Sequence, residues 1–253
     1  GPVTPSAAKV PQYERLELAV DLGASYDNPF DPDQVSLDAV FTTPSGKEIV
    51  VPGFFMVSFR RRVADGAEIM IPEDNGGWKV RFAPAETGRY RWKLRLRDRT
   101  GQVAGAEGAF EALAAKGHGF VRTSRADPHY FAFDDGTGYF AVGHNLPIYH
   151  TRGQLGDEAM RRFAAARENF NRWWMSSSGL GFVCAGRLGW YRQDTAARID
   201  LVLDVARELG LVYMMCMDTH QDFRQRGWER NPFNARNGGP CRTPADWFTN
   251  ETA

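Results

Sequence analysis

The second half of the chain contains three apolar stretches. Polar or aromatic side chains, six in all, lie at the end of these stretches or directly after them. Each stretch has the length and composition of a buried strand, and α/β proteins carry their sites at the carboxyl ends of such strands. Because these ends meet at one edge of a parallel sheet, the six side chains are expected to share a site. They are His144, Asn145, Arg172, Trp174, Asp218 and His220.

Asp218 and His220 lie two positions apart, so in an extended strand their side chains point to the same side. A carboxylate beside an imidazole decides which ring nitrogen carries the proton, which suits a pair that faces a substrate. The alternative is a strand end with a solvated histidine. A metal site would need a third ligand, for which His144 is the candidate, and no metal is expected.

Tryptophan and asparagine residues are frequent after residue 170 and favour a carbohydrate ligand. The apolar face of a sugar ring stacks on an indole, while its hydroxyl groups bond to amides and carboxylates. The alternative is that the tryptophans are core residues and the asparagines form turns. Trp173 is expected in the core, because it points away from Arg172 and Trp174. The further candidates for sugar contact are Trp190, Trp228, Asn231, Asn234 and Asn237.

These side chains are positioned by a predicted alternation of strands and helices. Helical spacing predicts one helix capped by Asp157 and another capped by Asp194 and ended by Gly210. Strands joined by such helices open a (β/α)8 barrel or a doubly wound sheet, and the lack of a glycine-rich phosphate loop disfavours a nucleotide-binding version. The predicted strands are 139–145, 170–175 and 211–217.

The first half of the chain predicts a different architecture. Apolar residues alternate in short segments separated by turn residues, which is typical of an all-β sandwich. Residues 86–90 resemble a tyrosine corner built on Tyr90, and a plain strand with core aromatics is the alternative. A hinge at 114–119 and a β-hairpin at 130–140 follow. The predicted strands are 15–20, 35–41, 49–59, 78–82, 90–96 and 107–113.

Composition excludes several classes of protein. The 253 residues include 31 basic and 31 acidic ones, a balance that argues against a nucleic-acid partner. No apolar run reaches the roughly 18 residues that a membrane helix needs. Three cysteines without a CxxC pair exclude a full disulfide framework. Cys216 is interpreted as a small core residue, with a nucleophile as the alternative. Gly1 and Pro2 look like a protease scar, so the cellular compartment stays unknown.

The order of several short motifs carries a family resemblance, although no single motif is decisive. An N-x-x-R-x-W-M pattern falls on Asn169, Arg172, Trp174 and Met175. The other motifs are 119–122, 130–137, 142–145, 187–191, 218–220, 231–234 and 237–241. Together they resemble bacterial glycoside hydrolases with a clan A (β/α)8 barrel, cellulase-like or mannanase-like, preceded by a fibronectin-like β-sandwich.

The resemblance implies retaining hydrolysis of a plant or microbial polysaccharide or oligosaccharide by two carboxylates, without a cofactor. It places Arg172 near the nucleophile, and Asp218 and His220 near the floor of a substrate subsite. The acid/base of such enzymes usually belongs to an Asn-Glu pair after the fourth strand. This chain has no such pair at a strand end, so both catalytic carboxylates are expected beyond residue 253.

These inferences predict a multi-domain β plus α/β protein. It comprises a tail at 1–12, an immunoglobulin- or fibronectin-like sandwich at 13–115 and about three strand-helix units of a barrel at 116–253. Because a barrel needs about 250 residues, the rest is expected in a longer gene, a second chain or another protomer. The alternatives are a non-catalytic carbohydrate-binding or scaffolding protein with a degenerate partial barrel, and an unrelated α/β enzyme that uses Asp218, His220 and Cys216.

Overall fold

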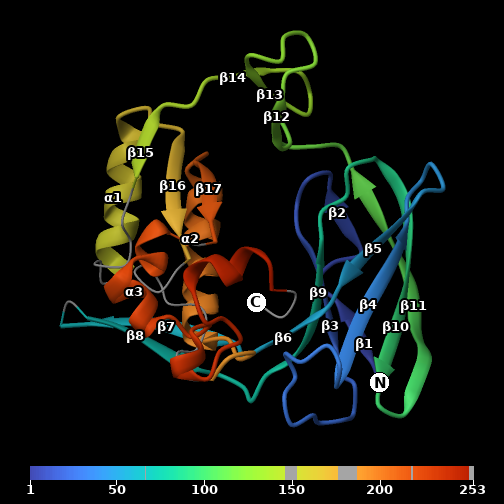
Figure 1. Cartoon of the computed structure of the whole chain (residues 1–253). Coiled ribbons are helices and arrows are strands. Elements are labelled where there is room, and N and C mark those ends of the chain that lie inside the picture. Colours follow the sequence, from blue (N-terminus) through green and yellow to red (C-terminus); the bar gives the residue numbers. More distant parts are fainter. Residues whose placement is uncertain (66, 146–152, 176–186, 218, 251–253) are drawn as a thin grey trace. The chain divides into compact units, whose positions relative to one another are not determined.

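The computed structural model describes residues 1–65, 67–145, 153–175, 187–217 and 219–250 (Figure 1). The described chain is mostly β and falls into two compact units. We call Gly1–Met56 with Gly76–Phe140 the β unit, and Val57–Asn75 with Ala141–Ala253 the α/β unit. Residues 57–75 thus group with the second half of the chain and not with the strands on either side of them.

Two sheets form most of the β unit. Neighbouring strands are antiparallel, except that β2 and β11 are parallel. The four-stranded sheet has the order β1 (Val3–Pro5), β3 (Leu16–Val20), β9 (Gly77–Phe82) and β6 (Phe54–Met56). The five-stranded sheet has the order β2 (Lys9–Pro11), β11 (Gly101–Leu113), β10 (Gly88–Asp98), β4 (Val35–Thr42) and β5 (Glu48–Pro52).

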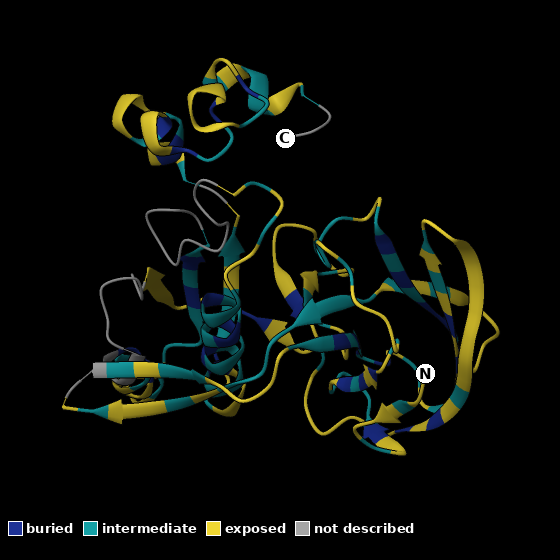
Figure 2. Ribbon diagram, turned by 90° about the horizontal axis from the view of Figure 1, so that it is seen from below, coloured by how far each residue is buried: buried dark blue, intermediate teal, exposed yellow. Residues whose placement is uncertain are grey.

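One hydrophobic core lies between these two sheets. Leu16 and Leu18 of β3 and Phe41 of β4 are fully buried. Phe41 stacks on Phe82 of the other sheet, with ring centroids 4.1 Å apart. Buried segments alternate with less buried ones along these strands (Figure 2), as strand geometry requires when one face is covered. The period-two pattern therefore predicted the inward residues correctly.

Tyr90 forms the hydrogen bond expected of a tyrosine corner. Its hydroxyl accepts from the backbone N–H of Glu86 over 2.9 Å. The ring is buried and stacks on Phe110, with centroids 5.0 Å apart. Burial raises the pKa of Tyr90, so the hydroxyl stays protonated at neutral pH. The bond satisfies a backbone donor at the start of a long strand.

A small antiparallel sheet ends the β unit and confirms the predicted hairpin. Its order is β12 (Val121–Thr123), β13 (Phe131–Phe133) and β14 (Gly138–Tyr139). Gly136 turns the chain with a φ of 88°, a conformation that glycine adopts without strain.

The described part of the α/β unit contains three parallel strands joined by two helices, as predicted. The first strand covers only 143–145 of the predicted 139–145, since Tyr139 ends β14 in the β unit. Strand order in the sheet follows chain order. The elements are β15 (Gly143–Asn145), α1 (Gly153–Ala165), β16 (Phe170–Trp174), α2 (Gln193–Glu208) and β17 (Val212–Cys216). Helices α1 and α2 share a hydrophobic core with one face of the sheet, in which Met160 of α1 and Trp173 of β16 are fully buried. The prediction that Trp173 is a core residue is confirmed.

The helix starts differ from the predicted ones, whereas one helix end agrees. Helix α1 begins at Gly153, so Asp157 lies inside it and does not cap it. Helix α2 begins at Gln193, and Asp194 lies in its first turn, paired with Arg192 at 2.8 Å. Asp157 pairs instead with Arg61, and Asp194 pairs with Arg192. Gly210 follows α2 with a φ of 70°, as a C-terminal glycine should.

The sequence analysis missed a second hairpin, formed by β7 (Phe59–Ala64) and β8 (Ala67–Pro72). It also missed the short strands β1 and β2, which lie in the predicted tail at 1–12, and β12. The side chains of this hairpin bind α1 and α2 of the same unit. Arg61 bonds to Asp157 of α1 at 2.5 Å, and Glu68 bonds to Arg198 of α2 at 2.6 Å. Arg61 and Glu68 also pair at 3.5 Å, and the Glu68 side chain is 5% exposed. The hairpin is thus held by a largely buried ion network.

The chain after β17 forms short helical turns. They are η2 (His220–Phe223), α3 (Gln225–Arg230), η3 (Ala235–Asn237) and η4 (Pro244–Phe248). Among the described residues, no helix is both long and apolar enough to cross a membrane.

Candidate functional site

The parallel sheet of the α/β unit has two chemically different faces. Trp173 and its neighbours in β17, Tyr213 and Met215, pack with α1 and α2. The intervening residues point to the opposite side, because side chains alternate along a strand and neighbours in register share a face. We call this second side the site face. It carries Asn145 of β15, Arg172 and Trp174 of β16, and Met214 and Cys216 of β17.

Arg172 lies at the centre of the site face. Its guanidinium carbon is 4.6 Å from the ring centroid of Trp174, and its Nε donates to the Cys216 sulfur over 3.3 Å. Among the described residues, no carboxylate lies within ion-pair distance of Arg172. A cation stacked on an aromatic ring, with its terminal nitrogens not engaged by a carboxylate, is suited to bind an anion or sugar hydroxyl groups.

His144 and Asn145 were predicted to share the site but lie on opposite faces. Asn145 is in register with Arg172. The His144 ring meets Phe163 of α1, with centroids 4.1 Å apart, and its Nδ1 is 2.9 Å from a carboxylate oxygen of Glu168. The structure therefore places His144 on the side of the helices and only Asn145 with Arg172.

The predicted pair of Asp218 and His220 is described in part, since Asp218 lies outside the described residues. His220 is exposed and begins η2, where its Nε2 is 3.2 Å from the side-chain nitrogen of Gln221. The Thr219 side chain caps this turn. His220 thus follows β17 on the chain, at the carboxyl end of that strand.

The asparagines after η2 bind the backbone of their own segment. Asn231 donates to the Asp222 carbonyl over 3.2 Å, and Asn234 donates to the Trp228 carbonyl over 2.8 Å. Asn237 donates to the Asn231 carbonyl over 2.8 Å. Asn231, Asn234 and Trp228 are buried. Their contacts agree with the alternative interpretation, in which the amides form turns and the tryptophan packs.

Trp190 lies before α2 and is half-buried. The guanidinium carbon of Arg187 is 3.6 Å from its ring centroid. Trp190 and Arg187 thus form a second stacked pair like that of Trp174 and Arg172.

Met214 and Cys216 lie on the site face but were not among the predicted substrate-binding residues. Of the two, Cys216 contacts Arg172. It was interpreted as a small core residue because it lies in an apolar run between Met215 and Met217. A continuous apolar run does not reveal which residues face the helices. The register shows it, since Cys216 is the partner of Trp174 and is only partly buried. Alternation along the strands was the signal that could have found it, because Arg172, Trp174 and, in the neighbouring strand, Met214 and Cys216 point to the same side.

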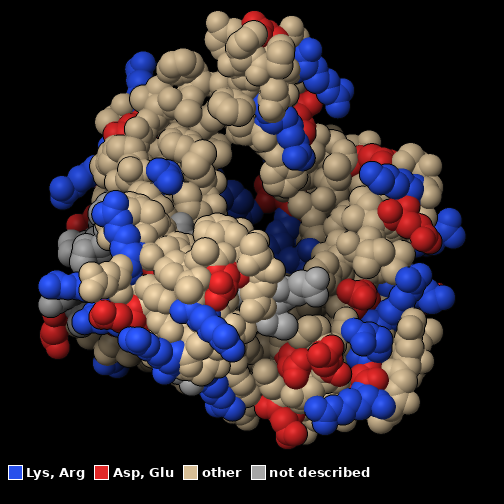
Figure 3. All heavy atoms as spheres, in the orientation of Figure 1, with Lys and Arg blue, Asp and Glu red and all other residues tan. Residues whose placement is uncertain are grey.

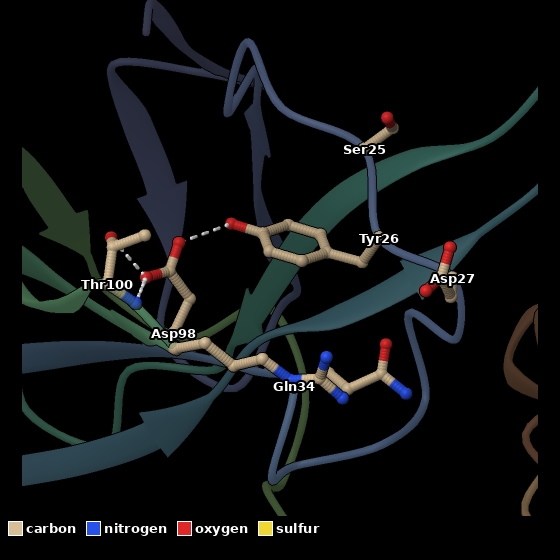
Figure 4. Close-up of a pocket in the computed structure, with 7 residues that line it drawn as sticks. Ser25, Tyr26, Asp27, Gln34, Asp98 and Thr100 are labelled. Carbon is tan, nitrogen blue, oxygen red and sulfur yellow. Dashed lines mark hydrogen bonds between the residues drawn. The ribbon is translucent and has the colours of Figure 1, made fainter.

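A small pocket of about 210 Å³ lies in the β unit beside Tyr26 and Asp98 (Figure 4). Tyr26 donates to Asp98 over 3.2 Å, and the second Asp98 oxygen accepts from Thr100. The Thr100 bonds lower the pKa of Asp98, and burial raises that of Tyr26. Gln34 is also bonded at both ends, to Asn28 and Asp31. These polar groups form hydrogen bonds with one another, so we interpret them as stabilising the loops that carry them.

The described residues contain no cluster of three or more histidine, cysteine, aspartate or glutamate side chains that could hold a metal ion. Charged side chains of both signs are interspersed on the face drawn in Figure 3, as befits a chain with a formal net charge of zero.

The profile of a domain of unknown function, DUF5060, matches residues 9–97, which lie mostly in the β unit. No curated protein matches the chain. The crystal structure of a "putative glycoside hydrolase" from Bacteroides vulgatus ATCC 8482 aligns with 83% of this chain and 41% of its own, at 20% identity and a TM-score of 0.59. This likeness concerns the fold, and our chain spans less than half of that protein.

Two further structures align with larger differences. Purple acid phosphatase PPD1 from yellow lupin (Lupinus luteus) seeds is 12% identical over 88% of this chain and 36% of its own, with a TM-score of 0.29. A family 39 glycoside hydrolase from Bacteroides cellulosilyticus WH2 is 8% identical over 86% of this chain and 34% of its own, with a TM-score of 0.26. Scores this low support no argument about either unit.

Proposed function

We propose that the chain is part of a retaining glycoside hydrolase in which β15, β16 and β17 are the first three strands of a clan A (β/α)8 barrel. The β unit is then the fibronectin-like sandwich that precedes the barrel. Three observations support this: parallel strands in chain order, helices on one face of the sheet, and a fold like that of the Bacteroides vulgatus protein.

The observation that carries the proposal is the stacked pair of Arg172 and Trp174 at the carboxyl end of the central strand. The interior of a barrel is the side away from its helices, and the active site lies at the carboxyl ends of the strands. The pair lies on that side and at that end. The indole offers a stacking surface to a sugar ring, and the guanidinium offers several donors to hydroxyl or carboxylate groups.

In the proposed mechanism, one carboxylate attacks the anomeric carbon and the other protonates the leaving oxygen and then activates water. Both carboxylates are contributed by strands beyond residue 253, in the same gene, a second chain or another protomer. Arg172 holds the nucleophile as a carboxylate and orients it. Asn145 contacts sugar hydroxyl groups beside it, and Asp218 and His220 bind the substrate at the end of the third strand.

The test uses the enzyme with the strands that complete the barrel. We expect it to release reducing ends from a panel of β-linked glucans, mannans and xylans, with retention of the anomeric configuration by ¹H NMR. Arg172→Ala should lower kcat about a hundredfold or more, because the charge that orients the nucleophile is lost.

Arg192→Ala is the matched control, since Arg192 pairs with Asp194 on the surface of the same unit and should leave the rate unchanged. Inversion of configuration would contradict the retaining mechanism. Sugar binding without turnover would favour a carbohydrate-binding protein instead. Equal rates in the Arg172 and Arg192 variants would remove Arg172 from the site.

A further inference from the structure

The Arg172 guanidinium is held at two of its surfaces. Its π face lies against Trp174, and its Nε edge points at the Cys216 sulfur, 3.3 Å away. The sulfur belongs to a partly buried free cysteine on the neighbouring strand, directly beside Trp174 in the register. Both supports come from strands, which hold a side chain more rigidly than loops do.

A guanidinium offers two forks to a carboxylate. One consists of Nε–H with one terminal N–H, and the other consists of the two terminal nitrogens. The Cys216 sulfur occupies the Nε position, so it blocks the first fork. A carboxylate that meets Arg172 must then use the terminal fork, which fixes its direction of approach.

We infer that Cys216 is a positioning residue, which directs the terminal fork of Arg172 toward the anionic group of the reaction. This inference rests on the proposed function for its catalytic consequence, but the hydrogen bond itself can be tested without any sugar. Cys216 does not react with the substrate. It acts through Arg172, by excluding the alternative fork and by limiting the rotation of the guanidinium on Trp174.

Two substitutions distinguish the loss of the hydrogen-bond acceptor from a change in side-chain size. Cys216→Val removes the acceptor and keeps an apolar side chain of similar size, which strands accommodate well. Cys216→Ser keeps an acceptor at nearly the same place. Both variants must retain the wild-type melting temperature within about 3 °C, which limits any general loss of stability. If the valine variant falls outside this limit, Cys216→Thr and Cys216→Ala replace the two variants. Threonine combines an acceptor with a branched side chain, and alanine has no acceptor.

The first readout is exchange of the Arg172 Nε–H with water, measured by ¹⁵N NMR on the present chain and assigned with Arg172→Lys. We expect slow exchange in the wild type, exchange at least about tenfold faster in the valine variant and an intermediate rate in the serine variant. An unchanged rate in the valine variant would overturn the inference.

The second readout is turnover by the enzyme with the completed barrel. The valine variant should lower kcat about tenfold with little change in KM, and serine should restore most of it. If exchange accelerates while kcat stays constant, Cys216 holds the side chain but does not serve the reaction, and the inference fails. If the wild type neither binds nor cleaves sugars, the proposed function fails, whereas the exchange result still decides whether Cys216 positions Arg172.

Discussion

The β unit and the α/β unit differ in what covers their sheets. In the β unit, two sheets enclose one core, so the side chains that point inward are apolar and pack against one another. In the α/β unit, α1 and α2 cover one face of the parallel sheet, and the site face carries an arginine, an indole and a thiol. The difference shows where function can reside, because a face that is not needed for packing against helices can hold polar groups.

The adjacent residues Trp173 and Trp174 show the difference between the two faces of the parallel sheet. Trp173 is fully buried under the helices, whereas Trp174 is partly exposed and stacks on Arg172. We expect Trp173→Ala to lower the free energy of unfolding by about 3–5 kcal/mol, because it leaves a large cavity. Trp174→Ala should cost about 1 kcal/mol or less. Urea unfolding followed by helical ellipticity measures both, since the described helices lie in this unit. Equal losses would contradict the distinction between the faces.

The hairpin of β7 and β8 tests whether the α/β unit depends on residues from the first half of the chain. Glu68→Gln removes the charge between Arg61 and Arg198 and should destabilise the α/β unit by about 2–3 kcal/mol, because Arg198 loses its carboxylate partner and Arg61 keeps only Asp157, in a largely buried place. Arg60→Ala, which breaks an exposed pair with Glu73 on the same hairpin, should change stability by less than about 0.5 kcal/mol. If Glu68→Gln left the free energy of unfolding unchanged, the hairpin would not contribute to the stability of this unit.

The tyrosine corner should affect the β unit alone. Tyr90→Phe leaves the Glu86 N–H without its acceptor and should cost about 1–2 kcal/mol. Tyr130→Phe is the control, because Tyr130 is largely exposed. Hydrogen exchange of the strands should accelerate in β10 and β4 and stay constant in β16. Acceleration in β16 would mean that the two units unfold together.

The smallest expected effect is a pH dependence in the β unit. Burial pushes the pKa of Glu17 upward, but hydrogen bonds from Lys79 and Arg81 outweigh burial and lower the pKa below its ordinary value. A lowered pKa in the folded state stabilises the fold above the ordinary value, and this stabilisation is lost as the pH falls through the lowered value. Glu17→Gln should therefore reduce the melting temperature near pH 7 and have less effect near pH 3. A constant difference across this range would exclude ionic stabilisation by Glu17.

The sequence predicted best those features that depend on neighbours along the chain. Alternation located β3 and β4, and Gly210 marked the end of α2, because period and backbone conformation are local properties. The hairpin of β7 and β8 was missed although Asp-Gly is a common hairpin turn, because its apolar residues are interrupted by three consecutive arginines, residues 60–62.

The candidate site was predicted only in part, for a related reason. Which face His144 occupies depends on pairing with β16 and on Glu168, neither of which the spacing of residues reveals. Asn231 and Asn234 are amides whose partners are backbone groups of the same segment, and sequence alone does not distinguish such amides from sugar-binding ones. Cys216 became visible only through the register with Trp174.

The central claim is that the site face binds a sugar and the helix-covered face does not. Calorimetric titration with cello-, manno- and xylo-oligosaccharides, carried out on the enzyme with the completed barrel, tests it directly. We predict that Arg172→Ala and Trp174→Ala each weaken binding of the preferred oligosaccharide about tenfold or more, a loss of about 1.4 kcal/mol. His144→Ala, on the other face, should leave the affinity unchanged. Equal affinity in all three variants and the wild type would contradict the account.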